Sequence, residues 1–359
     1  MKRRKTRELS LGKVRIGGDS PISVQSMTKT DTRDVEATIQ QIQSLERVGC
    51  EIVRVAVLNM EAADCLGRIK DGISIPLIAD IHFDYRLALK AIEKGVDGLR
   101  LNPGNIGDAE RIKEVVMAAK DRGIPIRIGV NAGSLEKDIL ERYGHPTADA
   151  MVESAMRHIM ILEALDFHDI KVSLKASDII KTIGAYRLLA ERVDYPFHIG
   201  ITEAGTYSSG TVRSAVGLGI LLADGIGDTI RVSLTGPPEE EVKVGYEILK
   251  SLGLRKRGIN VISCPTCGRV KINVVSLAEK IERKLAYLET PLNVAVMGCV
   301  VNGPGEAKEA DIGIAGGNGV GMIYIGGKAV KKIKESDIVN ELVREVERMV
   351  NGCMRTTGG

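Results

Sequence analysis

The sequence predicts an α/β protein in which a (β/α)8 TIM-type barrel is followed by a smaller α+β domain. First, its 359 residues exceed the length at which one hydrophobic core usually stops growing. Second, short apolar runs alternate with amphipathic helical patterns through the first two-thirds of the chain, which is typical of parallel β/α units. Third, eight such runs occur, and eight units favour a closed barrel. An open doubly wound sheet is the alternative, because a strand count alone does not prove closure.

The predicted barrel strands are rich in β-branched residues, and the segments between them repeat apolar residues at helical spacing. The strands are expected at residues 22–26, 52–57, 76–80, 98–101, 125–130, 170–174, 197–202 and 229–234. The intervening helices include residues 35–48, 85–94, 109–122, 148–165, 177–193 and 208–223. These elements define a first domain, residues 1–254.

The pattern changes after residue 249, where a charged, glycine-bearing segment marks the boundary to a second domain, residues 255–359. Strands are expected there at residues 260–263, 293–297, 311–315 and 321–325, and helices at residues 270–287 and 336–350. Asn318-Gly319 separates the last two strands, and Asn-Gly is a strong hairpin signal. The glycine-rich run around it lacks the lysine and hydroxyl of a phosphate-binding loop, so we interpret it as a hairpin.

The composition argues against several classes of protein. A net charge of +3 with 3% aromatic residues does not suit a nucleic-acid surface, which combines a basic stripe with stacking rings. No stretch approaches the roughly 18 apolar residues of a membrane span, and the basic N-terminus lacks the apolar core of a signal peptide. Six cysteines in so long a chain suit a reducing compartment better than a disulfide framework. We expect a cytoplasmic protein that binds neither nucleic acid nor membranes.

Basic side chains lie inside or at the ends of the apolar barrel strands. They are Arg54, Arg100, Arg127, Lys175 and Arg231. Arginine is rarely buried without a partner, and pairing with carboxylates such as Asp80 and Glu203 would explain any single one. For all five together we favour a binding site, because barrels build their sites at the C-terminal strand ends. Guanidinium groups match phosphate oxygens, so the expected ligand carries two or more negative charges, as a diphosphate does.

Polar residues cluster at the same strand ends. They are Asp80, His82, Asn102, Asn131, Ser173 and Ser233. Taken one at a time, each is also consistent with helix capping or with hydrogen bonding in a loop. Glu203 is the main candidate for a general acid, because a carboxylate beside a bound polyanion can gain a proton. His198 and His82 are the competing acid–base candidates.

Three cysteines and a glutamate of the second domain suggest a metal or cluster site. Cys264 and Cys267 form a CxxC pair, Cys299 follows a later apolar run, and Glu306 follows a proline-glycine turn. All five histidines precede residue 200, which disfavours a Cys2His2 zinc site. Iron–sulfur clusters are normally held by thiolates. Three thiolates and a weaker fourth ligand would leave one iron able to bind a substrate.

Two alternatives use the same residues differently. A cluster-free TIM-barrel enzyme, such as an aldolase or a pterin-type transferase, would bind a phosphate or an acid and carry a structural zinc knot. That zinc would need Cys353 or Glu306 as its fourth ligand, although we interpret Cys50, Cys65 and Cys353 as ordinary thiols. A zinc-bearing nucleic-acid module would use the basic residues 2–5 and 255–257. Neither alternative predicts iron.

Seven strings of the sequence together resemble one enzyme family, the 4-hydroxy-3-methylbut-2-enyl diphosphate synthases of the non-mevalonate isoprenoid pathway. They are QSMT at 25–28, ADIH at 79–82, LRLNPGN at 99–105, GVNAGS at 129–134, GITEAG at 200–205, SCPTCGR at 263–269 and MGCVVNGPGE at 297–306. The resemblance covers essentially the whole chain and is closest to the short, two-domain bacterial form. The two cysteine strings are highly specific.

The resemblance implies an oxidoreductase with a [4Fe–4S] cluster held by Cys264, Cys267, Cys299 and Glu306. It implies reductive ring opening of 2-C-methyl-D-erythritol 2,4-cyclodiphosphate, with two electrons consumed and water lost. Reduced ferredoxin or flavodoxin would be the electron donor. Family members are homodimers in which the cluster domain of one subunit closes over the barrel of the other, so a homodimer is expected here.

The resemblance also assigns roles to individual residues of this chain. Glu203 matches the barrel carboxylate that would deliver a proton, and Glu306 is the replaceable cluster ligand. Asn302 is a further candidate for a contact between the cluster domain and the substrate. The positions that match substrate contacts, or lie next to them, are Arg54, Asp80, Arg100, Asn102, Arg127, Asn131, Lys175, Arg231 and Ser233.

Overall fold

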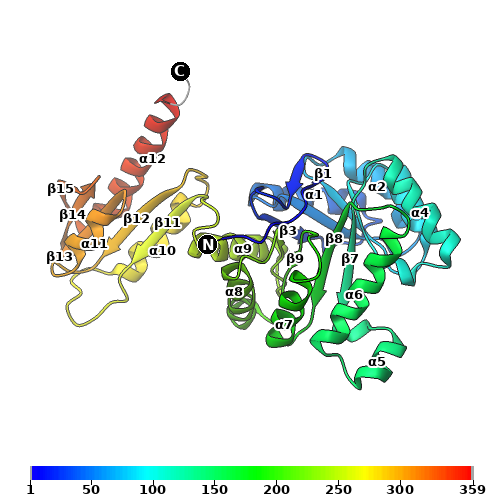
Figure 1. The fold of residues 1–359 in the computed structure, drawn as a ribbon. Helices are drawn as coiled ribbons and strands as arrows, with labels where there is room; N and C mark the ends of the chain where they lie inside the picture. The colour runs from blue at the N-terminus through cyan, green and yellow to red at the C-terminus, as the bar shows by residue number, and fades with distance from the viewer. Residues whose placement is uncertain (1, 357–359) are drawn as a thin grey trace. The chain divides into compact units, whose positions relative to one another are not determined.

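The structure, a computed structural model, describes residues 2–356 and the side chains of residues 2–352. Contacts divide the chain into two compact units, Met1–Arg255 and Lys256–Gly359, and each is described by itself below (Figure 1). The division falls one residue after the expected boundary. Among the described residues, no helix combines the length and the apolar character that a membrane span requires.

The N-terminal unit is built on a parallel sheet with eight strands among the described residues, in the order β8-β7-β6-β5-β4-β3-β10-β9. They are β3 (Ser23–Met27), β4 (Ile52–Ala56), β5 (Leu77–Asp80), β6 (Gly98–Arg100), β7 (Ile126–Asn131), β8 (Ile170–Lys175), β9 (His198–Ile199) and β10 (Thr229–Ile230). A parallel bridge between Val172 of β8 and Phe197, just before β9, joins the two ends of the sheet. The predicted barrel is therefore confirmed, and the open sheet is wrong.

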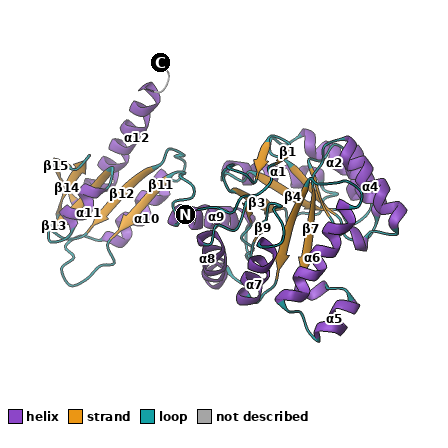
Figure 2. Ribbon diagram, viewed as in Figure 1, coloured by secondary structure: helices purple, strands orange, loops and turns teal. Residues whose placement is uncertain are grey.

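Helices surround the barrel, as Figure 2 shows for several of them. They are α1 (Val35–Arg47), α2 (Met60–Asp71), α3 (Tyr85–Glu93), α4 (Ala109–Asp121), α5 (Lys137–Tyr143), α6 (Ala148–Glu163), α7 (Ile179–Ala190), α8 (Tyr207–Ala223) and α9 (Pro238–Ser251). Side chains cap several N-termini: Asp34 accepts from the Ala37 amide, and Asp178 from the Lys181 amide. All six predicted helices are present, whereas α2, α5 and α9 were not among them.

The two ends of the barrel differ in polarity. A short hairpin, β1 (Leu9–Leu11) and β2 (Val14–Ile16), packs its leucines and Ile16 against Ile52 and Ile78, at the N-terminal ends of β4 and β5. Farther along β4, the third residue is Arg54 instead of an aliphatic residue. Side chains two residues apart share one face of a strand, so the interior changes from apolar to cationic toward the C-terminal strand ends.

The C-terminal unit has a five-stranded mixed sheet among its described residues, in the order β11-β12-β13-β14-β15. The strands are β11 (Ile259–Ser263), β12 (Leu292–Met297), β13 (Ile312–Gly317), β14 (Val320–Ile325) and β15 (Lys328–Lys334), and the helices are α10 (Val274–Leu285), α11 (Gly303–Glu309) and α12 (Ile338–Thr356). β11 to β13 pair in parallel, and β13 to β15 in antiparallel fashion. The predicted hairpin is confirmed: Asn318 and Gly319 have φ of 39° and 73°. The sequence patterns missed β15 and α11.

The two faces of this sheet are covered to different extents. On one face, Val294, Val296, Ile312 and Ile314 pack with residues of α10 and α12. On the other, Ala295, Met297 and Ala315 pack with Ala307 of the short helix α11. Cys264 packs against the clusters on both faces, and Cys299 lines a pocket together with Ala315 of the second face.

Candidate active site

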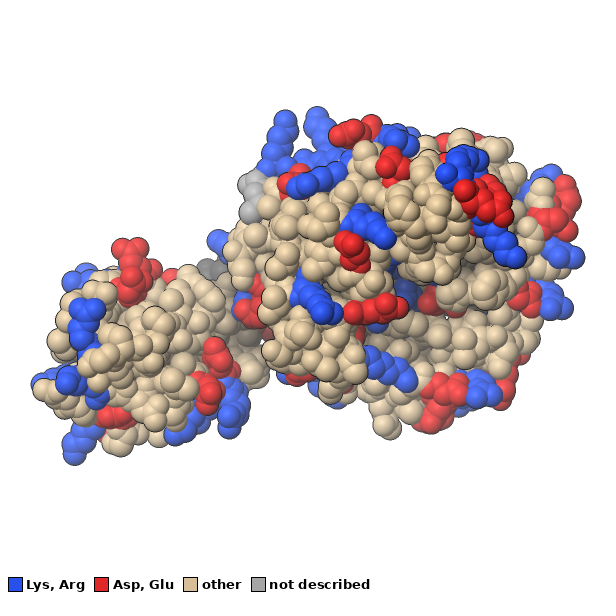
Figure 3. Space-filling view, turned by 90° about the horizontal axis from the view of Figure 1, so that it is seen from below, with Lys and Arg blue, Asp and Glu red and all other residues tan. Residues whose placement is uncertain are grey.

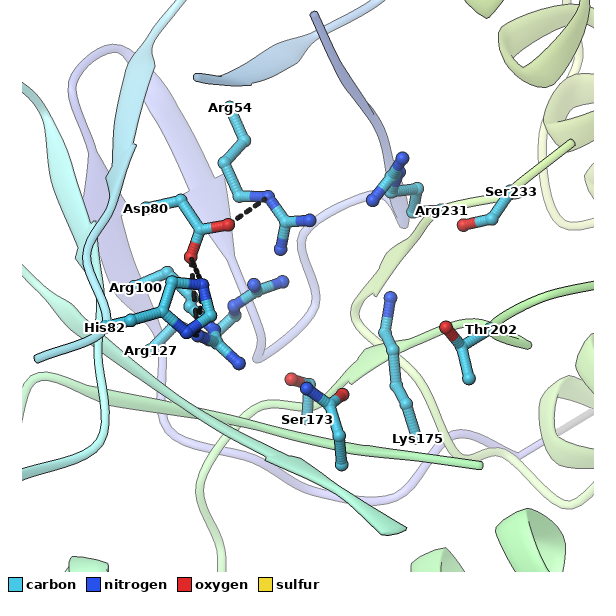
Figure 4. A pocket seen from close by; sticks show the side chains of 11 residues that line it. Arg54, Asp80, His82, Arg100, Arg127, Ser173, Lys175, Thr202, Arg231 and Ser233 are labelled. Carbon is cyan, nitrogen blue, oxygen red and sulfur yellow. Dashed lines mark hydrogen bonds and ion pairs between the residues drawn. The ribbon is translucent and has the colours of Figure 1, made fainter. Parts of the chain in front are cut away.

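A cavity of about 250 Å³ opens among the C-terminal ends of the barrel strands (Figure 4). Its lining consists of Arg54, Asp80, His82, Arg100, Arg127, Asn131, Ser173, Lys175, Thr202, Arg231 and Ser233. Five of these side chains are basic and one is a carboxylate. All five basic residues singled out from the sequence are therefore brought together.

Two glycines make room for these long side chains. A Cβ atom on Gly129 of β7 would lie 2.6 Å from Nε of Arg100. A Cβ atom on Gly200, just after β9, would lie 2.4 Å from the Arg231 carbonyl oxygen and 3.1 Å from Nζ of Lys175. The separations of 2.6 and 2.4 Å are closer than real Cβ contacts, so a larger residue at either position would displace Arg100 or the backbone at Arg231.

Asp80 is the one carboxylate among the described residues of the cavity wall. Its oxygens lie 3.6 Å from Nε of Arg54 and 3.4 Å from Nη1 of Arg100. Burial alone would raise the pKa of Asp80, but Arg54, His82, Arg100 and Arg127 overcome this and hold it well below its usual range. Asp80 is thus a fixed anion that orients two of the arginines.

Beyond Asp80, three of the cations have weak partners or none among the described residues. Arg127 is 2% exposed, and its Nε and Nη1 atoms have no hydrogen-bond partner among the described residues. Arg54 donates to the Met27 sulfur at 2.9 and 3.1 Å, although a thioether is only a weak acceptor. Arg231 lies 3.8 Å from Glu241, a buried carboxylate of α9. A buried cation without a full partner is costly, and an anionic ligand would remove that cost.

The pKa values reflect the same crowding. Burial, followed by repulsion from neighbouring cations, holds the pKa of Arg127 and of Lys175 well below their usual ranges. Burial is also the main cause that lowers the pKa of Arg231 to about 10, with Arg54 adding repulsion. The site is therefore electrostatically strained without an anion.

The neutral polar candidates divide into two groups. Asn131, Ser173 and Ser233 line the cavity. Asn102 does not line it. Its side-chain nitrogen Nδ2 donates to the Gly129 carbonyl oxygen at 3.1 Å, and its side-chain oxygen Oδ1 accepts from the Gly129 backbone amide at 2.8 Å. Asn102 thereby fixes the glycine that leaves space for Arg100.

The acid–base candidates occupy different environments. Glu203 is exposed in the loop after β9 and does not line the cavity, but its φ of 52° places it in the left-handed region, where non-glycine residues are strained. His198 is fully buried, 3.4 Å from Nζ of Lys175, and burial holds its pKa well below its usual range. His82 lies in the wall, 3.1 Å from Arg100.

Sequence reasoning missed three residues around this cavity. Thr202 lines it, Met27 lies between Arg54 and Arg231, and Glu241 accepts from the Leu234 amide at 3.1 Å. Thr202 belongs to the string GITEAG, so a motif signal existed. Glu241 lies in the run Pro238-Glu-Glu-Glu241, which gives no sign that one of its carboxylates is buried.

In the C-terminal unit, the cysteine loops follow two neighbouring parallel strands. Cys264 comes directly after β11, and Cys299 two residues after β12. The Cys264 amide donates to the Val296 carbonyl oxygen at 3.2 Å, which holds the start of the CxxC loop against β12. Cys264 and Cys299 are half-buried and Cys267 is exposed.

Hydrogen bonds favour the thiolate form of two of these cysteines. The backbone and the side chain of Arg269 donate to the Cys267 sulfur and lower its pKa. Backbone amides of Asn302, Val301 and Gly303 lower the pKa of Cys299 in the same way. The thiolate is the form that binds metals.

Glu306 lies on the exposed side of α11, and Asn302 is the residue from which that helix begins. Among the described residues, no three His, Cys, Asp or Glu side chains are grouped to hold one metal ion. The side chain of Cys353 lies outside the described residues.

The other cysteines belong to the barrel unit. Cys50 is buried, and burial raises its pKa to about 12. Cys65 is half-buried on α2. A raised pKa makes a thiol inert, so Cys50 matches the expectation of an ordinary thiol.

Comparisons with known proteins cover both units. A family model described as the GcpE TIM-barrel domain matches residues 6–246, and one described as the GcpE protein C-terminal domain matches residues 260–348. A protein of Geobacter sulfurreducens named 4-hydroxy-3-methylbut-2-en-1-yl diphosphate synthase (flavodoxin) is 64% identical over 96% of this chain and 98% of its own. A Symbiobacterium thermophilum protein of the same name is 62% identical over 97% of this chain and 94% of its own.

A solved structure gives a more distant comparison. The Plasmodium falciparum HPPK-DHPS structure has a TM-score of 0.50 and 11% identity, and the match covers 69% of this chain and 50% of that one. This similarity concerns the fold alone. The assignment to a family rests on the two family models and the two bacterial relatives. They confirm the resemblance that the sequence motifs indicated. The chain belongs to the GcpE family.

Proposed function

We propose that the chain converts 2-C-methyl-D-erythritol 2,4-cyclodiphosphate to 4-hydroxy-3-methylbut-2-enyl diphosphate in isoprenoid precursor biosynthesis. The reaction takes up two electrons and one proton; the ring carbon–oxygen bond breaks, a hydroxyl leaves as water, and a carbon–carbon double bond forms. The curated relatives carry the name of this synthase. The observation that carries the proposal is the cavity with five basic side chains and one carboxylate.

The cations would bind the two phosphates. Arg54 of β4 and Arg231, directly after β10, face the same space, and Lys175 points into it from β8 (Figure 4). Two buried nitrogens of Arg127, Nε and Nη1, have no hydrogen-bond partner in the part of the chain that the structure describes. Arginine can bind phosphate oxygens through two parallel hydrogen bonds, so a cyclic diphosphate would supply the partners that these groups lack.

Uncharged groups would orient the carbon skeleton. Asn131, Ser173, Thr202 and Ser233 lie among the cations and can donate to or accept from the substrate hydroxyls. Asp80 and Asn102 would act through other residues. Asp80 orients Arg54 and Arg100, and Asn102 fixes Gly129. Positioning of this kind contributes to the rate by holding a reactive geometry.

Cys264, Cys267, Cys299 and Glu306 would hold a [4Fe–4S] cluster. The donor set fits, because the three cysteines lie in the loops that follow the neighbouring strands β11 and β12, and hydrogen bonds lower the pKa of Cys267 and Cys299. When bound, such a cluster would supply electrons one at a time and one iron as a Lewis acid. Carboxylate is a harder ligand than thiolate, so Glu306 is the ligand we expect to exchange.

Glu203 would deliver the proton that the reaction consumes. Its exposed position in the loop after β9, next to Thr202 of the cavity wall, suits a group that exchanges protons with water. His198 is a weaker candidate, because it is fully buried and its pKa is held well below its usual range. Asn302, at the start of α11, would contact the substrate from the cluster side.

The proposed partners follow from the same reaction. The relatives' name specifies flavodoxin, so a reduced flavodoxin is the proposed donor, and ferredoxin is the alternative. We also propose that the protein is cytoplasmic. We propose a homodimer, because the cation cavity and the cysteine loops lie in separate units and must both reach one substrate.

Anaerobic purification tests this function. We expect brown protein with about four irons per chain, as a cubane cluster requires, and turnover of the cyclic diphosphate with reduced flavodoxin. Cys299→Ser should lose most of the iron, whereas Cys65→Ser, which changes a half-buried thiol of α2, should keep it. Stoichiometric zinc without iron, or iron without turnover, would contradict the proposal.

A further inference from the structure

The C-terminal sheet leaves one part of a face uncovered. α11 packs over Ala295 and Met297 of β12 and Ala315 of β13. Beyond it, a groove of about 640 Å³ runs past Cys299 to Met322 of β14 and Lys332 of β15. The register pairs Ala315 with Met322 and Met322 with Lys332, so these three side chains lie on the same face.

The groove is apolar beside the cysteine loop. Val300 and Val301, which directly follow Cys299, are 70% and 58% exposed. Single exposed aliphatic residues are common on protein surfaces. Two in succession beside a cluster ligand, continuous with Val320 and Met322 in the same groove, form an apolar patch of the kind that marks a binding surface.

The charges of the groove have one sign. Arg269, Lys271 and Lys332 line it, and no carboxylate is among its described lining residues. Lys334 pairs with Val320 in the ladder and extends the positive charge along β15. Lys331, by contrast, is paired with Glu341 at 2.7 Å. In Figure 3, Lys and Arg side chains gather at the edge of the C-terminal unit where Figure 1 places β14 and β15.

Lysines on an edge strand have a simpler explanation, because they prevent two sheets from pairing edge to edge. That explanation accounts for β15 but not for Arg269 and Lys271, which belong to the loop after Cys267. Nor does it account for the exposed valines beside Cys299. Cations from two separate segments converge on the apolar patch.

We propose that this groove is the docking surface for the reduced electron carrier, a flavoprotein that presents carboxylates around its redox group. The proposal rests on the function proposed above, which requires such a carrier. An apolar centre with a charged rim is the usual composition of a transient interface. Complementary charge accelerates association and orients the encounter, and here it would bring the carrier to the loop that holds Cys299.

The barrel mouth of a second copy is the main competing occupant. That mouth is lined by five basic side chains and one carboxylate, and the proposed homodimer already brings it to the cysteine loops. It therefore offers a single carboxylate to Arg269, Lys271 and Lys332 of the groove, whereas an acidic carrier offers several. This better charge complementarity is why we assign the groove to the carrier.

The test compares two reductants on the reconstituted holoprotein. The double variant Lys271→Glu/Lys332→Glu reverses the charge of the groove, and neither lysine belongs to the proposed catalytic groups. The control is Lys280→Glu, an exposed lysine of α10, the helix that packs on the opposite face of the sheet. Turnover of the cyclic diphosphate is measured with reduced flavodoxin and with photoreduced deazariboflavin, a small neutral donor.

We expect the double variant to raise the KM for flavodoxin on the order of tenfold, in line with the effect of electrostatic steering on association rates. Turnover with deazariboflavin, and both activities of Lys280→Glu, should stay unchanged. Turnover of the double variant that is unaltered with both donors would overturn the docking surface. A change in its oligomeric mass by light scattering would assign the groove to a second copy and would also overturn the proposal. Absence of turnover in the unmodified protein with either donor would instead overturn the proposed function.

Discussion

The barrel cavity and the C-terminal groove are both cationic, but they hold their charges in different ways. In the cavity, Arg127 and Lys175 are 2% and 7% exposed, and their pKa values are held well below normal. In the groove, Lys271 and Lys332 are exposed. Burying a charge costs free energy but strengthens its interaction with an ionic ligand. An exposed charge costs little, and salt screens its interactions. The first arrangement suits tight selection of a small anion, and the second suits brief encounters with a protein.

The largest effect is expected from Arg127→Met. This substitution removes a buried guanidinium with two unpartnered nitrogens, so kcat/KM for the cyclic diphosphate should fall on the order of 10³-fold, the range found when one buried electrostatic donor is lost. The free energy of unfolding without ligand should rise by about 1–4 kcal/mol, since an apolar replacement relieves buried charge. Steady-state kinetics and chemical denaturation measure the two quantities.

Lys271→Met is the matched control for Arg127→Met. It removes an exposed cation of the groove, so turnover with deazariboflavin and the free energy of unfolding should both stay nearly constant. A stability loss in Arg127→Met would show that the guanidinium is satisfied in the free protein. The proposed difference between the strained Arg127 of the cavity and the unstrained Lys271 of the groove would then be wrong.

Glu203→Gln should have the next largest effect. If Glu203 delivers the proton, kcat should fall about 10²-fold or more, the usual contribution of a general acid, while KM and cluster content stay the same. Glutamine has nearly the same size and shape as glutamate, so the substitution adds no strain at this position, where φ is 52°. We therefore expect the variant to fold normally. Glu289→Gln, at an exposed carboxylate of the C-terminal unit, serves as control. Unchanged turnover in Glu203→Gln would remove this residue from the mechanism.

Substrate binding should be coupled to proton uptake through Lys175. Burial and the nearby arginines depress its pKa in the free protein, and a bound dianion offsets those arginines. Each phosphate of the cyclic substrate has only one, strongly acidic, hydroxyl, so the ligand itself does not titrate near neutrality. Affinity should therefore be highest below the pKa of the free lysine. It should then fall about tenfold per pH unit until pH exceeds the pKa of the complex.

Calorimetry in two buffers of different ionisation enthalpy measures this uptake directly. The unmodified protein should take up as much as one proton per substrate bound, and Lys175→Met should abolish the uptake. An equal proton count in the variant would assign the titration to another group. Lys171 is then the group to examine, because burial lowers its pKa to about 7 and its amine has no hydrogen-bond partner among the residues that the structure describes.

Sequence reasoning found the barrel because its strands are apolar and regularly spaced. It found the cations because charge inside an apolar strand is conspicuous, as at Arg54 and Arg127. It missed β15 (KAVKKIK) and α11 (GPGEAKE), whose lysines and glycines hide their periodicity. It also could not show that Glu241 is buried near Arg231 or that the Asn102 side chain is hydrogen-bonded to the Gly129 backbone. Those facts depend on which elements pack together, which local patterns do not encode.

Salt should produce the smallest effect and separate the two regions most directly. Raising the ionic strength from 0.05 to about 0.3 M shortens the Debye length below about 10 Å, which screens the exposed Lys271 and Lys332 of the groove. Flavodoxin-dependent kcat/KM should therefore fall several-fold, as electrostatically steered association does. Turnover with neutral deazariboflavin should change far less, because Arg127 and Lys175 are shielded from solvent ions by burial. Equal salt dependence with both donors would mean that the screened step is substrate binding, so the cavity and not the groove would carry the salt-sensitive charge.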